Sequence, residues 1–274
     1  MTIWSDILLG IVQGFTEYLP VSGSGHLAVL QHLADVPVDG SYYFFHALVH
    51  AGTLIALMFV FREDMSQMRR QLTYHRLQRY ETRKKRYPKV RLATMILISC
   101  IPMLILIPFY SAFSRLSSRT AFVAIMLALT GGLIYVTDHM KEGQTSETNM
   151  SVLSALLIGI CQCVAVIPGV SRIAAAYGAG IGTGLKRDHA LRYALWLSVP
   201  ASLGIIVMNL ILGFKYGIAL SEVPGALIGM IFAIISGICA LHILRKSIDE
   251  EQYGNFAYYC WVAGAVALVL TFIF

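Results

Sequence analysis

The chain has 274 residues, of which 57 % are hydrophobic and only 13 % are charged. Several apolar runs reach about 18 residues or more, the length that a helix needs to cross a bilayer. The net charge of +6 is unevenly distributed: eleven of the 21 Lys and Arg residues lie between Arg62 and Arg91, and none lies in residues 1–61. This pattern excludes a soluble globular enzyme, argues against nucleic-acid binding and predicts an all-α polytopic membrane protein.

The first predicted element is an interrupted helix over residues 3–34. An apolar helical run begins at Ile3 and stops at Pro20, a short turn covers 21–25, and an apolar run restarts at His26. About 15 residues on either side of the turn are too few to span a hydrocarbon core, which needs ~20. We therefore predict a re-entrant helix pair, which is tolerated in a membrane only where it is buried in protein or lines a polar cavity.

Three full spans are expected after this element, and a basic segment follows the first of them in the chain. In chain order we predict a loop at 35–41, a span at 42–61, a span at 92–113 with kinks at Pro102 and Pro108, a turn at 115–119 and a span at 120–137. Because Lys and Arg concentrate in cytoplasmic loops, the segment 62–91 is predicted to be cytoplasmic. Its basic run at 83–86 is compatible with an amphipathic helix at the membrane interface.

The second half of the chain repeats the first. Residues 157–163 (LIGICQC) copy 9–14 (LGIVQG) almost residue for residue, and each copy runs on to a proline, a glycine and a serine. A polar loop at 138–150 divides one integral membrane domain, 1–274, into repeats of about 1–137 and 151–274. The second repeat is predicted to hold an interrupted helix at 151–185 and spans at 189–212, 223–244 and 256–274.

The number of spans fixes how the two repeats are oriented. Three full spans separate the interrupted helices, and an odd number forces opposite orientations. The first pair would then enter from outside and the second from the cytoplasm, so that their turns meet near the midplane. The predicted fold has six transmembrane helices and two re-entrant pairs in an inverted repeat, with both termini outside.

Backbone groups at the first turn are expected to contribute to an anion site. Ser22, Gly23, Ser24 and Gly25 form this turn. A helix that restarts here presents unpaired N–H groups and the positive end of its dipole. The glycines allow a close approach and positive φ angles. Two such helix N-termini that meet at mid-membrane form a site in which phosphate fits best.

The second turn has the sequence Pro-Gly-x-Ser-Arg and contains Gly169, Ser171 and Arg172. Ser171 can cap the restarting helix. The planar guanidinium of Arg172 can bind phosphate oxygens bidentately. The alternative is a simple turn with an arginine that reaches the interface. Because the repeat places this motif opposite the first turn, the anion site is favoured.

Glu17 is the only carboxylate between Asp6 and Asp35. It lies one helical turn after Gln13, so both polar groups share a helix face. A carboxylate at this depth is costly unless it is paired, protonated or bound to a metal ion. With Arg172 or a divalent cation it could stay charged and act as a base or a metal ligand. The alternative is that Glu17 and Arg172 form a purely structural ion pair.

Three histidines lie near these motifs. His26 could act as a general acid or donate to phosphate, or it could simply cap the start of a helix. His46 and His50 lie four residues apart and share a helix face, which could bind a metal ion or phosphate. Two histidines without a third ligand are weak evidence for a metal, and both could instead form hydrogen bonds within the bundle. His50 lies deeper and is a candidate substrate-binding residue.

Taken together, three motifs resemble the undecaprenyl-diphosphatase family, also called bacitracin-resistance proteins. They are Gln13-Gly14-x-Thr16-Glu17-x-Leu19-Pro20-Val21-Ser22-x-Ser24-Gly25-His26, His50-x-Gly52-Thr53 and Pro168-Gly169-x-Ser171-Arg172. The likeness covers the whole chain in order and spacing, including the basic loop. It implies an enzyme of the bacterial plasma membrane that removes the terminal phosphate of undecaprenyl diphosphate on the outer face, recycling the lipid carrier of cell-wall synthesis.

The resemblance carries the family's essential carboxylate, histidine and arginine over to Glu17, His26 and Arg172. The chain departs from the family at three positions. Gly23 replaces the middle serine, which is among the family's proposed nucleophiles, and Ile173 and Ala174 replace a serine and a glycine after the arginine. We therefore expect direct attack by water rather than a covalent serine intermediate.

The resulting prediction is a polyprenyl-diphosphate phosphatase whose partner is a lipid within the membrane. The expected substrate-binding residues are Gln13, Ser22, Gly23, Ser24, Gly25, His50, Gly169 and Ser171. A divalent cation, Mg²⁺ or Ca²⁺, could serve as cofactor with Glu17 as its ligand. Two alternatives belong to other functional classes: a transporter that flips polyprenyl phosphate by alternating access, and a non-catalytic paralogue that binds lipid phosphates.

Overall fold

The computed structural model describes residues 2–33, 40–77, 88–109, 112–113 and 115–273 and is helical, as predicted. Within these ranges the α-helices are α1 (Ile3–Tyr18), α2 (Gly23–Leu33), α3 (Gly40–Val60), α4 (Arg62–Leu77), α5 (Pro88–Leu106), α7 (Thr120–His139), α8 (Val152–Val164), α9 (Arg172–Gly182), α10 (Arg187–Tyr216), α11 (Val223–Asp249) and α12 (Asn255–Ile273). Short 3₁₀ turns occupy Ile107–Phe109, Arg115–Ser118 and Leu220–Glu222.

Six helical segments of the described chain are long and apolar enough to cross a membrane. They are Gly40–Val60, Lys89–Phe109, Thr120–His139, Arg187–Tyr216, Leu220–Asp249 and Asn255–Ile273. Each coincides with one of the six predicted spans, so the protein is a multi-pass membrane protein. The helices extend beyond the predicted ends in several places, because a helix continues past the hydrocarbon layer for as long as its backbone bonds can form.

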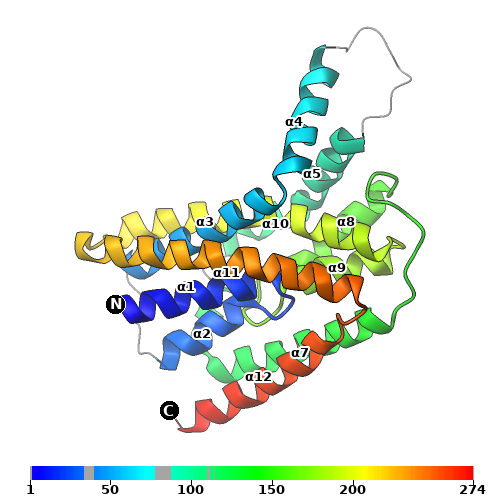
Figure 1. The fold of residues 1–274 in the computed structure, drawn as a ribbon. Helices are drawn as coiled ribbons and strands as arrows, with labels where there is room; N and C mark the ends of the chain where they lie inside the picture. The colour runs from blue at the N-terminus through cyan, green and yellow to red at the C-terminus, as the bar shows by residue number, and fades with distance from the viewer. Residues whose placement is uncertain (1, 34–39, 78–87, 110–111, 114, 274) are drawn as a thin grey trace.

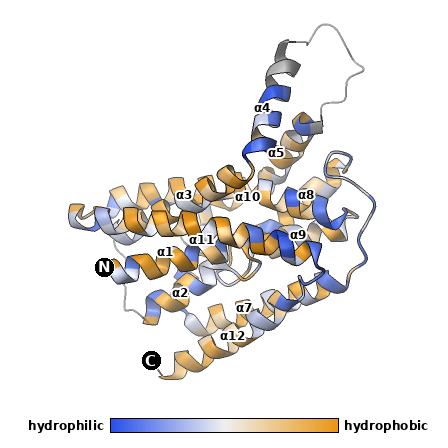
Figure 2. Cartoon of the chain, in the orientation of Figure 1, coloured by the Kyte–Doolittle hydropathy of each residue, from blue (hydrophilic) through white to orange (hydrophobic). Residues whose placement is uncertain are grey.

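The long helices lie side by side in one bundle (Figure 1). Helix α11 packs against α1 and α3, α3 also packs against α10, and α12 packs against α7. The two chain ends lie at the same end of the bundle, which fits an even number of spans. Figure 2 shows that the spans are mostly hydrophobic in colour, with polar residues gathered near the helix ends and in the interior.

The basic segment that follows the first span in the chain starts with helix α4. This helix projects away from the bundle and is hydrophilic in colour (Figure 2). Lys89, at the start of α5, donates to Asp64 of α4 over 2.6 Å and so fastens the two helices where they leave the bundle. The basic run at 83–86 and most of the predicted loop at 35–41 lie outside the described residues. Of that loop, Gly40 and Ser41 are already helical and begin α3.

Two pairs of short helices occupy the positions of the predicted interruptions. Helices α1, α2, α8 and α9 have 16, 11, 13 and 11 residues, each too short to cross a hydrocarbon core. The predicted turn at 21–25 is wrong in extent, because α2 begins at Gly23. Among the described residues of this turn, the left-handed conformation belongs to Ser22, with a φ of 69°, and not to either glycine.

Glycines in α1 let it lie directly on α11. A Cβ atom added at Gly10 would come within 2.3 Å of the carbonyl oxygen of Gly229. We expect Gly10→Ala to lower the free energy of unfolding by about 1–3 kcal/mol, because backbone atoms must move apart to make room. Gly132→Ala is the matched control on α7, since nothing lies within 4 Å of its added Cβ. Thermal unfolding in detergent compares the two variants, and equal melting temperatures would contradict the close packing.

Candidate active site

The carboxylate of Glu17 receives contacts from four helices. Its Oε1 accepts hydrogen bonds from Nη2 of Arg172 on α9 over 2.6 Å and from Oγ of Ser202 on α10 over 3.1 Å. Its Oε2 accepts from Nε2 of Gln13 on α1 over 2.9 Å and lies 3.5 Å from Nδ1 of His50 on α3. Glu17 is 6 % exposed, so these partners replace the water that the charge would otherwise require.

The turns of the two interrupted helix pairs touch beside this cluster. A Cβ atom added at Gly25 in α2 would lie 3.0 Å from Cα of Gly169 in the second turn. Gly169 has a φ of 97°, which a residue with a side chain rarely adopts. Oγ1 of Thr130 on α7 donates to the Gly169 carbonyl over 2.7 Å and accepts from the Ser171 N–H over 3.2 Å, which fixes the turn. With the two turns in contact, Glu17 and Arg172 lie within hydrogen-bond distance of each other, as predicted.

A cavity of about 590 Å³ borders the cluster. This volume lies within the range of small-molecule sites. Its polar lining residues include Ser24, Gln31, Tyr42, Tyr43, His46, His50, Gln162, Arg172 and Asn209. Apolar residues of α5 and α10 complete the wall. The cavity therefore combines a polar end at the interrupted helices with an apolar side between two spans.

The guanidinium of Arg172 has a buried nitrogen whose N–H groups are unused. Its Nη2 is held by Glu17, whereas Nη1 is buried and has no hydrogen-bond partner in the described chain. Buried donors without partners are rare in native proteins, because losing hydration without replacement is costly. A guanidinium with an unused donor beside a cavity is suited to an anionic ligand.

The three candidate serines differ in position. Ser24 is exposed and lines the cavity. Ser22 is buried and accepts from the Gly25 N–H over 3.3 Å, while Ser171 is buried and accepts from the Ala174 N–H over 3.2 Å. Both hydroxyls therefore cap the first turn of a helix by accepting from one of its backbone N–H groups. This was expected for Ser171 from its position after Pro-Gly. Of the three, only Ser24 is in direct reach of a molecule in the cavity.

His26 lies apart from the Glu17 cluster. Its Nδ1 is 2.9 Å from the Ser22 carbonyl oxygen, and its Nε2 is 2.9 Å from the hydroxyl of Tyr259 on α12, whose ring stacks on the imidazole. His26 is not among the residues that line the cavity. In this conformation both ring nitrogens have partners, so direct contact with a ligand beside Arg172 would require the Tyr259 bond to open.

The structure shows what surrounds the three residues that depart from the family pattern, Gly23, Ile173 and Ala174. A Cβ atom at Gly23 would lie 3.2 Å from Oγ1 of Thr16, so a serine there would require α1 to give way slightly. Ile173 and Ala174 are 1 % and 0 % exposed and belong to the main hydrophobic core. They pack the start of α9 in place of the polar and flexible residues that the pattern would supply.

Sequence reasoning missed three residues that shape the site: Thr130, Ser202 and Tyr259. Ser202 is a small polar residue two positions after Pro200 in a long apolar span, and a polar residue within a span is a usable signal for a position that faces the protein interior. Thr130 and Tyr259 carry no comparable signal. Their contacts depend on how α7 and α12 are rotated toward the turns, which residue spacing within each helix does not determine.

The described residues offer limited support for a metal ion. No group of three or more His, Cys, Asp or Glu is placed to hold one in the described part of the chain. Glu17 supplies a carboxylate, but donors already contact both of its oxygens. A Mg²⁺ ion commonly binds through one or two carboxylates together with substrate phosphates and water. Glu17 therefore fits only a cation that arrives with a phosphate ligand.

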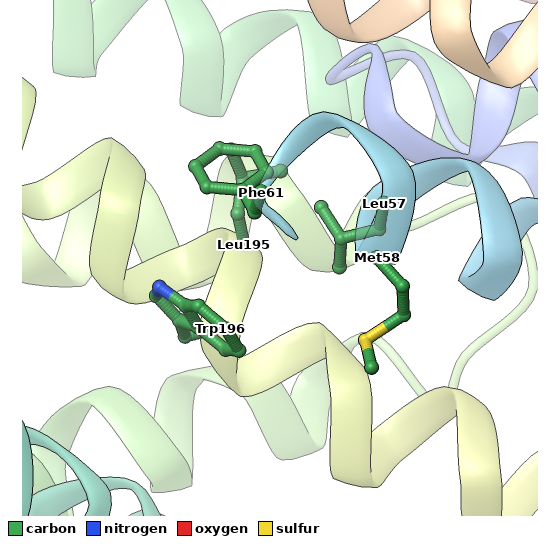
Figure 3. Close-up of a pocket in the computed structure, with 5 residues that line it drawn as sticks. All are labelled: Leu57, Met58, Phe61, Leu195 and Trp196. Atoms are coloured by element: carbon green, nitrogen blue, oxygen red, sulfur yellow. The ribbon is translucent and has the colours of Figure 1, made fainter. Parts of the chain in front are cut away.

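A second, smaller crevice lies between α3 and α10, away from this cluster. Figure 3 shows the apolar side chains of Leu57, Met58, Phe61 and Leu195 and the indole of Trp196 around it. Apolar atoms line the crevice, which has no room for a water molecule. It is a packing imperfection and offers no group that could take part in chemistry.

Comparison with known proteins decides the family. The profile of the family described as "Bacitracin resistance protein BacA" matches residues 6–266. The chain belongs to this family. Among its relatives, the undecaprenyl-diphosphatases of Desulforapulum autotrophicum and Halothermothrix orenii are each 33 % identical to it, and each alignment covers 100 % of both chains. The undecaprenyl-diphosphatase of Methanosphaera stadtmanae, an archaeon, is 31 % identical over 99 % of both chains.

Removing one member of the Glu17–Arg172 pair should destabilise this BacA-family protein. We expect Glu17→Gln and Arg172→Gln each to cost about 3–5 kcal/mol, because each leaves a buried charge without its partner. The double variant should cost less than the sum. The exposed pair Lys246 and Glu250, 3.7 Å apart, is the control, and a cycle on it should give about 0–1 kcal/mol. Denaturation in detergent measures both cycles, and additive costs at Glu17 and Arg172 would contradict the coupling.

Proposed function

We propose that the protein is an undecaprenyl-diphosphatase, which hydrolyses undecaprenyl diphosphate to the monophosphate and inorganic phosphate. Two kinds of evidence support this: full-length relatives that carry that name, and the pairing of Glu17 with Arg172 beside a cavity that suits a lipid diphosphate. The single observation that carries most weight is that Arg172 lines that cavity and that its buried Nη1 has no partner in the described chain.

In the proposed complex the diphosphate lies at the polar end of the cavity. Arg172 and Ser24 donate to its oxygens, with His50 beside them. Helix α9 begins at Arg172, so its N-terminal N–H groups and dipole also favour the anion. Phosphoryl transfer depends mainly on such positioning and on neutralising the oxygens that gain charge.

Hydrolysis then requires one water molecule. Its oxygen attacks the terminal phosphorus, the bond from that phosphorus to the bridging oxygen breaks, and the bridging oxygen leaves on the lipid monophosphate. Glu17 accepts the proton of the attacking water once Arg172 has turned toward the phosphate. Gln13 holds the carboxylate in place through its bond to Oε2. His26 remains the proposed proton donor to the leaving oxygen, provided that its bond to Tyr259 opens.

The lipid tail has a plausible path between α5 and α10. Leu104 and Ile107 on one side and Leu203 and Val207 on the other line the cavity and are also exposed, at 60, 48, 47 and 53 %. Exposed apolar side chains at the height of a membrane span face lipid. A polyprenyl chain in this gap would keep its tail in the bilayer while the headgroup reaches Arg172.

For the membrane arrangement we propose an inverted repeat with the first helix pair entering from outside and the second from the cytoplasm. The contact between Gly25 and Gly169 supports this, since the two turns meet inside the bundle. The basic residues of 62–91 favour a cytoplasmic position for that segment, which would put both termini and the open side of the cavity outside.

A divalent cation, Mg²⁺ or Ca²⁺, is a proposed partner of the bound diphosphate, with Glu17 as the protein ligand. Such a cation would supply charge neutralisation for the phosphate oxygens. The residues of the chain perform the remaining tasks, since Arg172 binds the phosphate and Gln13 orients Glu17.

Phosphate release from purified protein tests this function. With a C55 diphosphate in detergent, we expect turnover by the wild type and losses of about 10²–10⁴-fold in Glu17→Ala and about 10²–10³-fold in Arg172→Ala. Chelation of divalent cations should lower the rate, and Mg²⁺ or Ca²⁺ should restore it. Lys246→Ala, on the exposed surface, serves as the control. A folded wild type that releases no phosphate would refute the proposal.

The nucleophile can be tested separately. Ser24 is the serine of the first turn that reaches the cavity, so a covalent mechanism would depend on it. We expect Ser24→Ala to retain measurable turnover, with a loss of about 10-fold from one missing hydrogen bond to a charged oxygen. Complete loss of hydrolysis, with normal folding and normal binding of a diphosphate, would favour a serine nucleophile instead.

A further inference from the structure

Gln162, near the end of α8, has a buried amide without a partner. The residue is 4 % exposed, and its Nε2 makes no hydrogen bond within the described chain. Leaving a buried amide donor unpaired costs about 1–3 kcal/mol, so such a group in a native protein calls for an explanation. This amide plays no part in the contacts of Glu17 described above.

The side chain borders the same cavity as Arg172. Nη1 of Arg172 is the other unpaired donor there, and the two residues come from α8 and α9, which pack against each other on either side of the second turn. Two unused buried donors on residues that line one cavity call for acceptor oxygens. An anion with several oxygens, such as a phosphoryl group, meets that demand better than a neutral molecule.

The internal repeat explains why this amide is unused. Gln13 in the first repeat is the counterpart of Gln162, and its Nε2 donates to Glu17, four residues later on the same helix. The residue four positions after Gln162 is Val166, which has no acceptor in its side chain. The same amide therefore holds a carboxylate in the first repeat, whereas in the second it has no acceptor among the described residues.

We propose that Gln162 is a substrate-binding residue whose amide, together with Nη1 of Arg172, forms a subsite for a phosphoryl group of the lipid diphosphate. The identity of the ligand rests on the proposed function, whereas the subsite itself rests on the two unpaired donors. Gln162 carries no ionisable group, so it holds the headgroup and transfers no proton.

Direct binding tests the subsite without depending on hydrolysis. The probe is a farnesyl methylenediphosphonate, in which a CH₂ group replaces the bridging oxygen and cannot be cleaved by water. Its Kd is measured by titration calorimetry in detergent for the wild type, Gln162→Met and Gln162→Glu. Trp196→Phe is the matched control, because it also removes a buried unpaired N–H, but one that lies at the apolar crevice.

We expect Gln162→Met to raise the Kd by about tenfold or more, the effect of losing one hydrogen bond to a charged ligand. Gln162→Glu should raise it further, because a carboxylate repels the anion, and Trp196→Phe should leave it unchanged. If the side chain only fills space, Met would bind as the wild type does, which would overturn the inference. Should the Met variant not fold, Gln162→Asn, whose amide is one methylene shorter, should show the same weakening.

The result separates this inference from the proposed function. A wild type that binds the probe but releases no phosphate from a C55 diphosphate would refute the phosphatase activity and leave the subsite standing. A wild type that does not bind the probe would overturn the subsite, even if hydrolysis were observed by another route. Phosphate release with unchanged binding in Gln162→Met and Gln162→Asn would support the enzyme and refute the role of Gln162.

Discussion

The ion pair between Glu17 and Arg172 links the two halves of the molecule. The residues are far apart in the chain, yet Nη2 of Arg172 lies 2.6 Å from Oε1 of Glu17. The side chain of Glu17 is 2 % exposed and that of Arg172 is 17 % exposed, so water hydrates neither charge fully. Since an unpaired charge in a membrane interior is costly, each half can bury its charged residue only against the other. Packing of the two halves against each other and formation of the Glu17–Arg172 pair are therefore linked.

Close packing of backbones makes this meeting possible. Short helices that end inside a bundle leave N–H and C=O groups that need partners, and such ends are tolerated in a membrane only when protein covers them. Glycines make this possible because they let neighbouring backbones approach closely. Gly10 lies against Gly229, Gly159 against Ser99 and Gly25 against Gly169. Small residues at helix contacts are typical of membrane proteins, where lipid provides no hydrophobic drive for helices to associate.

Much of this organisation could be predicted from the chain alone. The six spans follow from apolar runs, and the interruptions follow from Pro20 and Pro168, because hydropathy and proline act locally. The pairing of Glu17 with Arg172 was also accessible, since isolated opposite charges in apolar surroundings need each other. These predictions required no knowledge of how helices rotate about their axes.

The remaining features depend on that rotation. His26 was expected beside Arg172, but its ring stacks on Tyr259 of α12, because its position on α2 turns it toward that span. Ser202 reaches Glu17 because α10 presents that face to α1. The start of α2 at Gly23 was also missed, since Ser22 takes the left-handed conformation that the glycines were expected to take.

The two halves of the chain contribute different groups to the site. The first contributes the acceptor, Glu17, and an amide committed to it, whereas the second contributes Arg172 and the amide of Gln162, which has no acceptor of its own. In the structure the guanidinium of Arg172 is paired with the carboxylate of Glu17. Under the proposed function, a diphosphate would replace Glu17 as the anionic partner of Arg172, while Glu17 would keep Gln13, His50 and Ser202 around it. The largely enclosed arginine would then have a counter-ion at every stage, which lowers the cost of holding its charge away from water.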